Sequence, residues 1–464
     1  MHGRLRRVWR LWATALICAS IVVIMHNSCS NSPLNPGDYE SRNADSIPTE
    51  SPHSTEPFDT IGGSGGTGIG INGSVHRIEL TLGSGLGTHA DAALVTESGM
   101  TVVGADDSLT WIDPVTGSKA KIVSLGGSPF DIAASSNGTI GVIGEFGVRL
   151  FDSTGILRHH ATTVAGTAPS SKARIDIAPD GTILVLLQTK TAVLLDMDLS
   201  LKTVVTLEES PTDMAVSSDL GLFFVCGFTQ ATSTLQIPWI HAYSFGGENV
   251  WTNYNKVVDG LMADSRCDIL CMSTAGVLYM AGEQAGGGSP FDRDPQQPAR
   301  AVSNGGPAPD SYQRPHNLNG SAHIAYIAQY DGSSGAWLKG THLLGRLSNN
   351  KGNTVLPQAL ACDRRGAVYL GGKMAFAVAN RDKVTINGRA MPGNGTFLAV
   401  FDGDFRRLLW ITLGTDGDVV GVGAWGSQCA VVTGETGRGV LTDGSDGEGS
   451  WLGVFPLDFA DSID

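Results

Sequence analysis

The sequence predicts an all-β protein, and within that class a seven-bladed β-propeller. Three observations carry this prediction: a strand–turn–strand pattern recurs along the chain, glycine is abundant (61 of 464 residues), and charged residues make up only 16%. No long stretch shows the apolar period of a helix, whereas short alternating runs bounded by glycine-containing turns are typical of strands. Four strands per repeat of at least about 40 residues is the sequence signature of a propeller blade.

The clearest copy of the repeat is Asp176 to Leu187, in which alternating residues lead into a Pro-Asp-Gly turn and an apolar strand follows. Glycine supplies the positive φ that such a turn needs. In most copies an apolar residue and Asp then precede another turn, as at Phe151-Asp152, and an Asp there fits an Asx-turn. A further strand comes after that turn. The seven copies span residues 92–103, 131–143, 176–187, 213–226, 268–281, 359–371 and 420–433.

The last copy, Val420 to Phe455, offers three strands only, and one strand stands alone ahead of the first copy, at Val75 to Leu82. We expect residues 75–82 to join the last blade and close the ring, because closure removes the exposed edges that an open array would leave. The propeller is then expected over residues 74–458. A β-sandwich or two smaller β domains is the alternative that the strand pattern leaves open.

The first 29 residues are typical of an export signal. Four arginines precede an apolar run from Leu11 to Met25, and this run is short for a membrane span. Cys29 predicts a bacterial lipoprotein, whose mature chain starts with a lipidated cysteine; a plain signal peptide with an incidental cysteine is the alternative. Residues 30–73 lack apolar periodicity and are rich in Ser, Pro and Gly, so we expect a flexible linker.

The net charge and the N-terminal signal together limit the classes of partner that this protein can have. The net charge is −14, which argues against nucleic acid because phosphate binding needs a basic surface. We expect an exported protein, periplasmic or on the cell surface, that touches the membrane only through its N-terminal signal or lipid. The sequence does not indicate the oligomeric state.

Four aspartates hold similar positions near the starts of the repeats: Asp131, Asp176, Asp213 and Asp268. Convergent acids there would line the mouth of the central channel, where a propeller enzyme holds a metal or a base. The interpretation that we favour is that they hydrogen-bond the neighbouring blade. We assign no catalytic residue and no metal ligand, since no familiar catalytic or phosphate-binding motif stands out.

The largest insertion runs from Gly282 to Ala322 and carries six prolines. Long connections in compact domains are often functional or disordered. We therefore take Tyr312, Arg314 and His316 as candidate recognition residues, together with the connection between residues 373 and 395 in the next blade. A mobile decoration without a binding role is the alternative.

Five cysteines follow the signal region, and their spacing matches no zinc motif. We favour the interpretation that they are small buried apolar residues. A cross-strand disulfide that includes Cys226 is the alternative in an oxidising compartment. We expect no cofactor; the alternative is calcium at Asp443 to Glu448, which resembles a calcium loop but lacks the EF-hand spacing. The five cysteines are Cys226, Cys267, Cys271, Cys362 and Cys429.

From Asp268 onward the repeats resemble the bacterial propeller repeats labelled SBBP. Those units read as a glycine turn, a V-Y-x-x-G strand, a variable loop, an A-x-V-x-x-x-D strand, a turn and a W-x-x-x-x-G strand. The matching segments are Gly366–Gly371, Phe397–Asp402 and Leu409–Gly414, and the first copies also look like propellers of the NHL or YVTN type. The resemblance implies an exported, surface or envelope protein without a common catalytic site, so no active residues carry over.

These features predict an exported, envelope-tethered β-propeller that acts as a non-catalytic binding or scaffold module for a protein or glycan partner. The alternative is a propeller enzyme, similar to a lactonase or a quinoprotein, with a metal or polar site at the mouth of the central channel. Fold alone does not decide between them.

Overall fold

The structure is a computed structural model of the chain. All of its strands belong to one compact unit, Thr67–Asp464. The residues that it describes are 76–79, 90–96, 98–113, 116, 118–256, 263–285, 289–302, 322–343, 345–346, 352–375, 385–386, 389–405, 407–413, 417–425, 428–433 and 450–456.

Within these residues the strands form seven four-stranded antiparallel sheets and two short hairpins. The first sheet holds β2 (Ala92–Val95), β3 (Thr101–Ala105), β4 (Ser108–Ile112) and β5 (Lys119–Ser124). The second holds β6 (Pro129–Ala134), β7 (Ile140–Gly144), β8 (Gly147–Phe151) and β9 (Leu157–Ala161). The third holds β10 (Arg174–Ile177), β11 (Ile183–Leu187), β12 (Thr191–Leu195) and β13 (Leu201–Thr206). The fourth holds β14 (Ser210–Ser217), β15 (Leu222–Thr232), β16 (Leu235–Ser244) and β17 (Asn249–Tyr254).

The remaining sheets carry the long connections. The fifth holds β18 (Asp264–Met272), β19 (Val277–Ala285), β20 (His323–Asp331) and β21 (Trp337–Leu343). The sixth holds β24 (Val355–Cys362), β25 (Val368–Met374), β28 (Gly395–Phe401) and β29 (Arg407–Thr412). The hairpins are β22 (Gly345–Arg346) with β23 (Gly352–Asn353), and β26 (Thr385–Ile386) with β27 (Arg389–Ala390).

The last sheet combines strands from both ends of the described chain. Its order is β1 (His76–Glu79), β32 (Trp451–Pro456), β31 (Gln428–Thr433) and β30 (Val419–Trp425). β1 runs antiparallel to β32, with His76 opposite Val454 and Glu79 opposite Trp451. β1 lies within the strand expected at residues 75–82.

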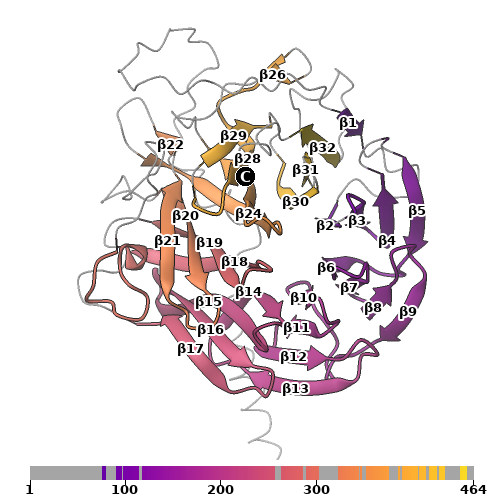
Figure 1. The fold of residues 1–464 in the computed structure, drawn as a ribbon, viewed down its shortest axis with the longest axis horizontal. Helices are drawn as coiled ribbons and strands as arrows, with labels where there is room; N and C mark the ends of the chain where they lie inside the picture. The colour runs from indigo at the N-terminus through magenta and orange to yellow at the C-terminus, as the bar shows by residue number, and fades with distance from the viewer. Residues whose placement is uncertain are drawn as a thin grey trace, which may run out of the picture. The chain divides into compact units, whose positions relative to one another are not determined.

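The sheets follow one another around a ring, with β2, β6, β10, β14, β18, β24 and β30 innermost (Figure 1). The contacts between inner strands run from β2 to β6, β10, β14, β18, β24 and β30, and β30 contacts β2 again. The prediction of an all-β propeller is therefore confirmed, and the β-sandwich alternative is excluded.

The core lies between neighbouring sheets rather than at one centre, as β11 illustrates. All five of its side chains are buried, because alternate side chains of a strand point to opposite faces and a sheet covers each face. Ile183, Val185 and Leu187 pack towards the second sheet, and Leu184 and Leu186 pack towards the fourth. Each such burial contributes about 1.5–3 kcal/mol, which is why strands inside a sheet read as unbroken apolar runs.

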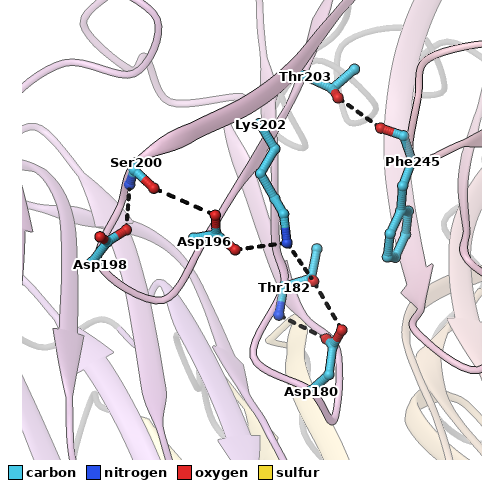
Figure 2. A network of polar contacts seen from close by, with 8 residues as sticks. All are labelled: Asp180, Thr182, Asp196, Asp198, Ser200, Lys202, Thr203 and Phe245. Carbon is cyan, nitrogen blue, oxygen red and sulfur yellow. Dashed lines mark hydrogen bonds and ion pairs between the residues drawn. The ribbon is translucent and has the colours of Figure 1, made fainter.

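The turn chemistry of the repeat is as the sequence predicts. Gly181 has φ +89°, and Asp180 accepts a 2.8 Å hydrogen bond from the backbone N–H of Thr182. At the next turn Asp196 pairs with Lys202 at 2.7 Å, and Thr203 reaches into the neighbouring sheet, where its hydroxyl donates to the carbonyl of Phe245 at 2.6 Å (Figure 2). Polar turns thus set the register of each sheet and also connect it to the next.

Candidate functional site

Three of the four repeated aspartates join neighbouring sheets through partly buried hydrogen bonds. In each case a carboxylate oxygen on one inner strand accepts from a backbone N–H on the inner strand of the following sheet. The interpretation that these side chains hydrogen-bond the neighbouring blade therefore holds at three positions. The pairs are Asp131 with Ile175 (2.9 Å), Asp176 with Val216 (2.8 Å) and Asp213 with Leu270 (2.8 Å).

A local irregularity of the inner strand accompanies two of these bonds, those of Asp131 and Asp213. The pairing of β6 with β7 shifts register between Pro129 and Asp131, and that of β14 with β15 shifts between Pro211 and Asp213. A β-bulge of this kind bends the strand and re-aims its side chain. Proline beside the bulge is compatible with it, because proline has no N–H to give to the ladder. The sequence thus places an acid where the strand turns it towards the next sheet.

Gln358 makes a similar bond from the sixth sheet to the seventh. Its Oε1 accepts from the backbone N–H of Val419 on β30 at 3.0 Å, and its Nε2 donates to Asp418 at 2.6 Å. The repeat pattern did not indicate this residue, because Ala359 holds the position of Asp213 and Gln358 lies one residue earlier, at the register shift.

Asp268 differs from the other three aspartates, because it belongs to a partly buried cluster of charged side chains on β18, β19 and β20. Arg266 Nε lies 2.7 Å from Asp268 Oδ1 and 2.9 Å from Glu283 Oε1. His323 Nδ1 lies 3.3 Å from the same Glu283 oxygen. Glu283 is only 3% exposed, so its charge is compensated by these partners rather than by water.

Burial dominates the titration of the four aspartates, since loss of water disfavours a charged carboxylate. It raises the pKa of Asp131, and it raises the pKa of Asp176 to about 6 against the opposing effect of backbone N–H donors. It likewise raises the pKa of Asp213 and of Asp268 to about 7, the latter against the charge of Arg266. The carboxyls of Asp176, Asp213 and Asp268 therefore titrate closer to neutral pH than ordinary aspartates do.

The pKa of His323 is also raised, but for a different reason. Burial alone would disfavour its cation, but the hydrogen bond and the charge of Glu283 outweigh burial, and the pKa of His323 is raised. The cluster thus gains a proton more readily than a solvent-exposed histidine would. Structural ion pairs shift pKa values as catalytic groups do, so the shifts alone do not identify a catalytic centre.

The second strands of the fourth and fifth sheets are longer than the second strands of the earlier sheets. β15 has 11 residues and β19 has 9, whereas β7 has 5. Two contacts place the connections between second and third strands beside the starts of inner strands. Gln236 at the start of β16 donates its N–H to Asp264 at 2.6 Å, and His323 at the start of β20 donates its N–H to Thr354 at 3.4 Å. We call the connections β15–β16, β19–β20 and β25–β28 the extended rim.

The first part of the β19–β20 connection is firmly packed. A 3-10 helix, η1 (Pro290–Asp292), is capped by Ser289, whose Oγ accepts from the N–H of Phe291 at 3.0 Å. The Phe291 ring stacks on Tyr326 with centroids 4.4 Å apart, and Trp337 Nε1 donates to the Tyr326 hydroxyl at 3.1 Å. The insertion therefore begins on an aromatic base formed by the fifth sheet.

This packing corrects the expectation of one loop from Gly282 to Ala322. β19 continues through Ala285, because its partner strand β20, also nine residues long, pairs with it as far as His323. Between residues 373 and 395, β25 ends at Met374 and the hairpin β26–β27 follows. The remaining sequence candidates lie outside the described residues: Tyr312, Arg314, His316, Cys29 and the 443–448 loop.

Among the described residues, four cysteines carry free thiols: Cys226, Cys267, Cys271 and Cys362. Cys226 and Cys267 are fully buried in one apolar cluster, as expected for small apolar residues. Nothing joins Cys226 to another cysteine; the Thr212 hydroxyl lies 3.4 Å from its sulfur. In the same described part of the chain, no three His, Cys, Asp or Glu side chains gather as metal ligands would, and no helix has the length and apolar character needed to cross a membrane.

Comparison with known proteins gives a structural likeness and no family. No protein-family model matches the sequence, and no curated protein matches it. Among solved structures the chain is similar to Raptor from Chaetomium thermophilum, with a TM-score of 0.48 and 11% identity over 80% of this chain. The match spans only 28% of that protein's length, and likeness at this level says nothing about activity or partners. The resemblance to SBBP repeats thus stays a prediction, and the protein is assigned to the β-propeller fold on its own sheets.

Proposed function

We propose that this chain is an exported β-propeller, tethered to the cell envelope, that binds a protein or glycan partner through the extended rim and carries out no catalysis. The observation that carries the proposal is the use made of the inner-strand carboxylates. An enzyme would direct such groups towards a substrate in the channel. Here Asp131, Asp176 and Asp213 each accept a hydrogen bond from a backbone N–H of the next sheet. Their role is therefore to hold neighbouring sheets together.

The extended rim supports the binding role. Binding residues are commonly found on loops that a rigid scaffold positions. The β15–β16 hairpin projects exposed side chains from residues 231–234, and the β19–β20 connection stands on the packed aromatic base of Phe291 and Tyr326. A firm base lowers the entropy that a binding loop loses when it is ordered by a partner.

A seven-bladed ring closed by the N-terminal strand fits the proposed tether. β1 follows the linker directly and pairs with β32. A pull on the tether would therefore load the last sheet through its backbone hydrogen bonds. We infer that β1 has two tasks, to cover the edge of β32 and to attach the ring to the linker that starts at Cys29.

Site-specific photocrosslinking in intact cells tests the binding surface. The crosslinking residue replaces Thr232, which is exposed on the extended rim, or Asp219, which is exposed in the opposite turn of the same sheet. We expect one discrete adduct from position 232 and none from position 219, and a glycan array then decides between a protein and a glycan partner. Equal labelling at both positions, or adducts only at 219, would contradict a rim partner.

Mass spectrometry of the protein extracted from its native membranes tests the tether. A diacylated chain that begins at Cys29 is expected, and C29A should release the protein from the membrane fraction. An unmodified soluble chain would contradict the lipid anchor and leave the rim proposal to its own experiment.

The alternative function, a propeller enzyme, is favoured by one observation, the raised pKa values of Asp213 and Asp268, which would suit general acids near neutral pH. Elemental analysis of the purified protein checks it. A stoichiometric metal that is lost in D213N would favour the enzyme over the binding module.

A further inference from the structure

Two cysteines from different sheets meet near the inner surface of the ring. Cys271 lies at the end of β18 and Cys362 at the end of β24, and these inner strands contact each other. Both side chains pack against the same apolar cluster, and the two thiols lie close enough to interact with one another. Both are free thiols, so the seam between the fifth and sixth sheets is bridged by a non-covalent sulfur contact.

The surroundings of this pair differ from those of the other two cysteines. Cys226 and Cys267 are fully buried, whereas Cys271 and Cys362 are half-buried at the edge of the apolar cluster that contains Tyr279. A small oxidant can therefore approach the pair but not the buried thiols. The same cluster holds both side chains against the seam, so neither needs to leave its own strand to reach the other.

We propose that Cys271 and Cys362 are an oxidation site, at which a disulfide forms between the fifth and sixth sheets. Two S–H bonds break and one S–S bond forms. The two protons and two electrons pass to an oxidising disulfide such as glutathione disulfide, whose S–S bond breaks as two S–H bonds form. The site depends on the proposed export only for its supply of oxidant, because disulfides persist in oxidising compartments.

The chemistry of the pair makes this exchange slow at neutral pH. Burial, the contact with Cys362 and the nearby Asp176 and Asp213 carboxyls all raise the pKa of Cys271. Since the thiolate is the attacking species, oxidation accelerates as the pH rises. The disulfide, once formed, is correspondingly slow to be reduced by small thiols.

The consequence concerns the two sheets that bear the longest connections. The disulfide closes a loop over residues 272–361, which includes the β19–β20 connection, and links the fifth sheet covalently to the sixth. A cross-link over a long loop restricts the unfolded chain more than the folded one. The site would therefore fasten the two sheets at the ends of their inner strands, on the face opposite the extended rim.

The experiment uses the full chain, purified with its cysteines reduced and then incubated with glutathione disulfide. Remaining thiols are alkylated, and peptides are mapped without reduction. We expect a cross-linked peptide pair containing Cys271 and Cys362, lighter by two hydrogens than the reduced pair, and a rise in Tm of about 5 °C that dithiothreitol reverses.

The matched control is C226A, which should retain the cross-link, whereas C362S should abolish it. The wild-type peptide map decides the question even where a variant fails to fold. Separate alkylation of Cys271 and Cys362 after oxidation, a glutathione adduct on each, or a cross-link through another cysteine would overturn the proposal. A protein that is not exported yet forms the cross-link in vitro would contradict the proposed localisation and leave this site intact.

Discussion

The carboxylate of Asp213 on β14 accepts a 2.8 Å hydrogen bond from the backbone N–H of Leu270 on β18. One side chain thus satisfies a backbone donor of the next sheet, and the two residues are 57 positions apart in the sequence. Loss of this partner would leave a donor near the core of the ring without its acceptor, and a buried polar group in that state costs about 1–3 kcal/mol.

D213A is therefore expected to lower the free energy of unfolding by about 1–3 kcal/mol. D213N should come closer to the wild type, because its amide oxygen can still accept the Leu270 N–H. Chemical denaturation monitored by tryptophan fluorescence measures both. D219A, at an exposed turn of the same sheet, is the control and should leave stability unchanged. Equal stability of D213A and wild type would contradict the inter-sheet role.

Stability should fall as the pH rises from about 4 to 7. The folded pKa values of Asp176 and Asp213 are about 6 and about 7, against an ordinary value of 3.8. Between these values the folded chain binds more protons than the unfolded chain, so the contribution is fully present below the unfolded pKa and is lost as the pH passes the folded pKa. The total is of the order of a few kcal/mol.

Calorimetry at successive pH values measures this slope, and the double variant D176N/D213N should flatten it. The raised pKa of His323 acts in the same direction, so some slope should remain in the double variant. A wild-type Tm that climbs steadily from pH 4 to 7 would show that these carboxyls are not protonated in the fold.

Deletion of residues 75–82 should destabilise the ring. It removes the four residues of β1 that pair with β32, at a cost of about 1–4 kcal/mol from the lost cross-strand pairs, and it exposes a sheet edge that favours aggregation. Thermal unfolding with light scattering measures both effects. Deletion of residues 32–60 from the linker is the control and should shift neither. Identical behaviour of the two deletions would contradict a role for β1 in stabilising the ring.

G181V should be destabilising by about 1–3 kcal/mol. Gly181 has φ +89°, and an added Cβ would lie 2.3 Å from Met197. The matched substitution is Gly246→Val, since an added Cβ there meets only the Ser244 hydroxyl oxygen at 3.5 Å. Urea titration of the two variants should separate them clearly, and similar midpoints would mean that the turn relaxes without strain.

The part of this architecture that is local in sequence was predictable. The Asp–turn–strand unit predicted the sheets and the turns, because Gly181 and Asp180 serve contacts only a few residues away. Gln358 escaped because it makes its bond from one residue ahead of the aligned position, which Ala359 holds. The repeat therefore specified the position of the inter-sheet bond only to within one residue, and it did not specify every chemical group that makes the bond.

The cluster around Arg266 was not predictable in the same way. Its partners Glu283 and His323 meet it only after β18, β19 and β20 have paired. No spacing along the chain predicts this contact, because the length of the β19–β20 connection is unrelated to the repeat. The same holds for Cys271 and Cys362, whose contact crosses from one sheet to the next.

The pairing of β1 with β32 places residue 76 directly opposite residue 454. The two ends of the described chain are thus near neighbours, although almost the whole sequence lies between them. A chain with this arrangement suits circular permutation, in which a short peptide joins the old ends. New ends could open at the exposed Ala165–Gly166 turn between β9 and β10, where a cut separates two sheets without interrupting either. The fold then depends on the order of the sheets around the axis, and not on which sheet comes first in the sequence.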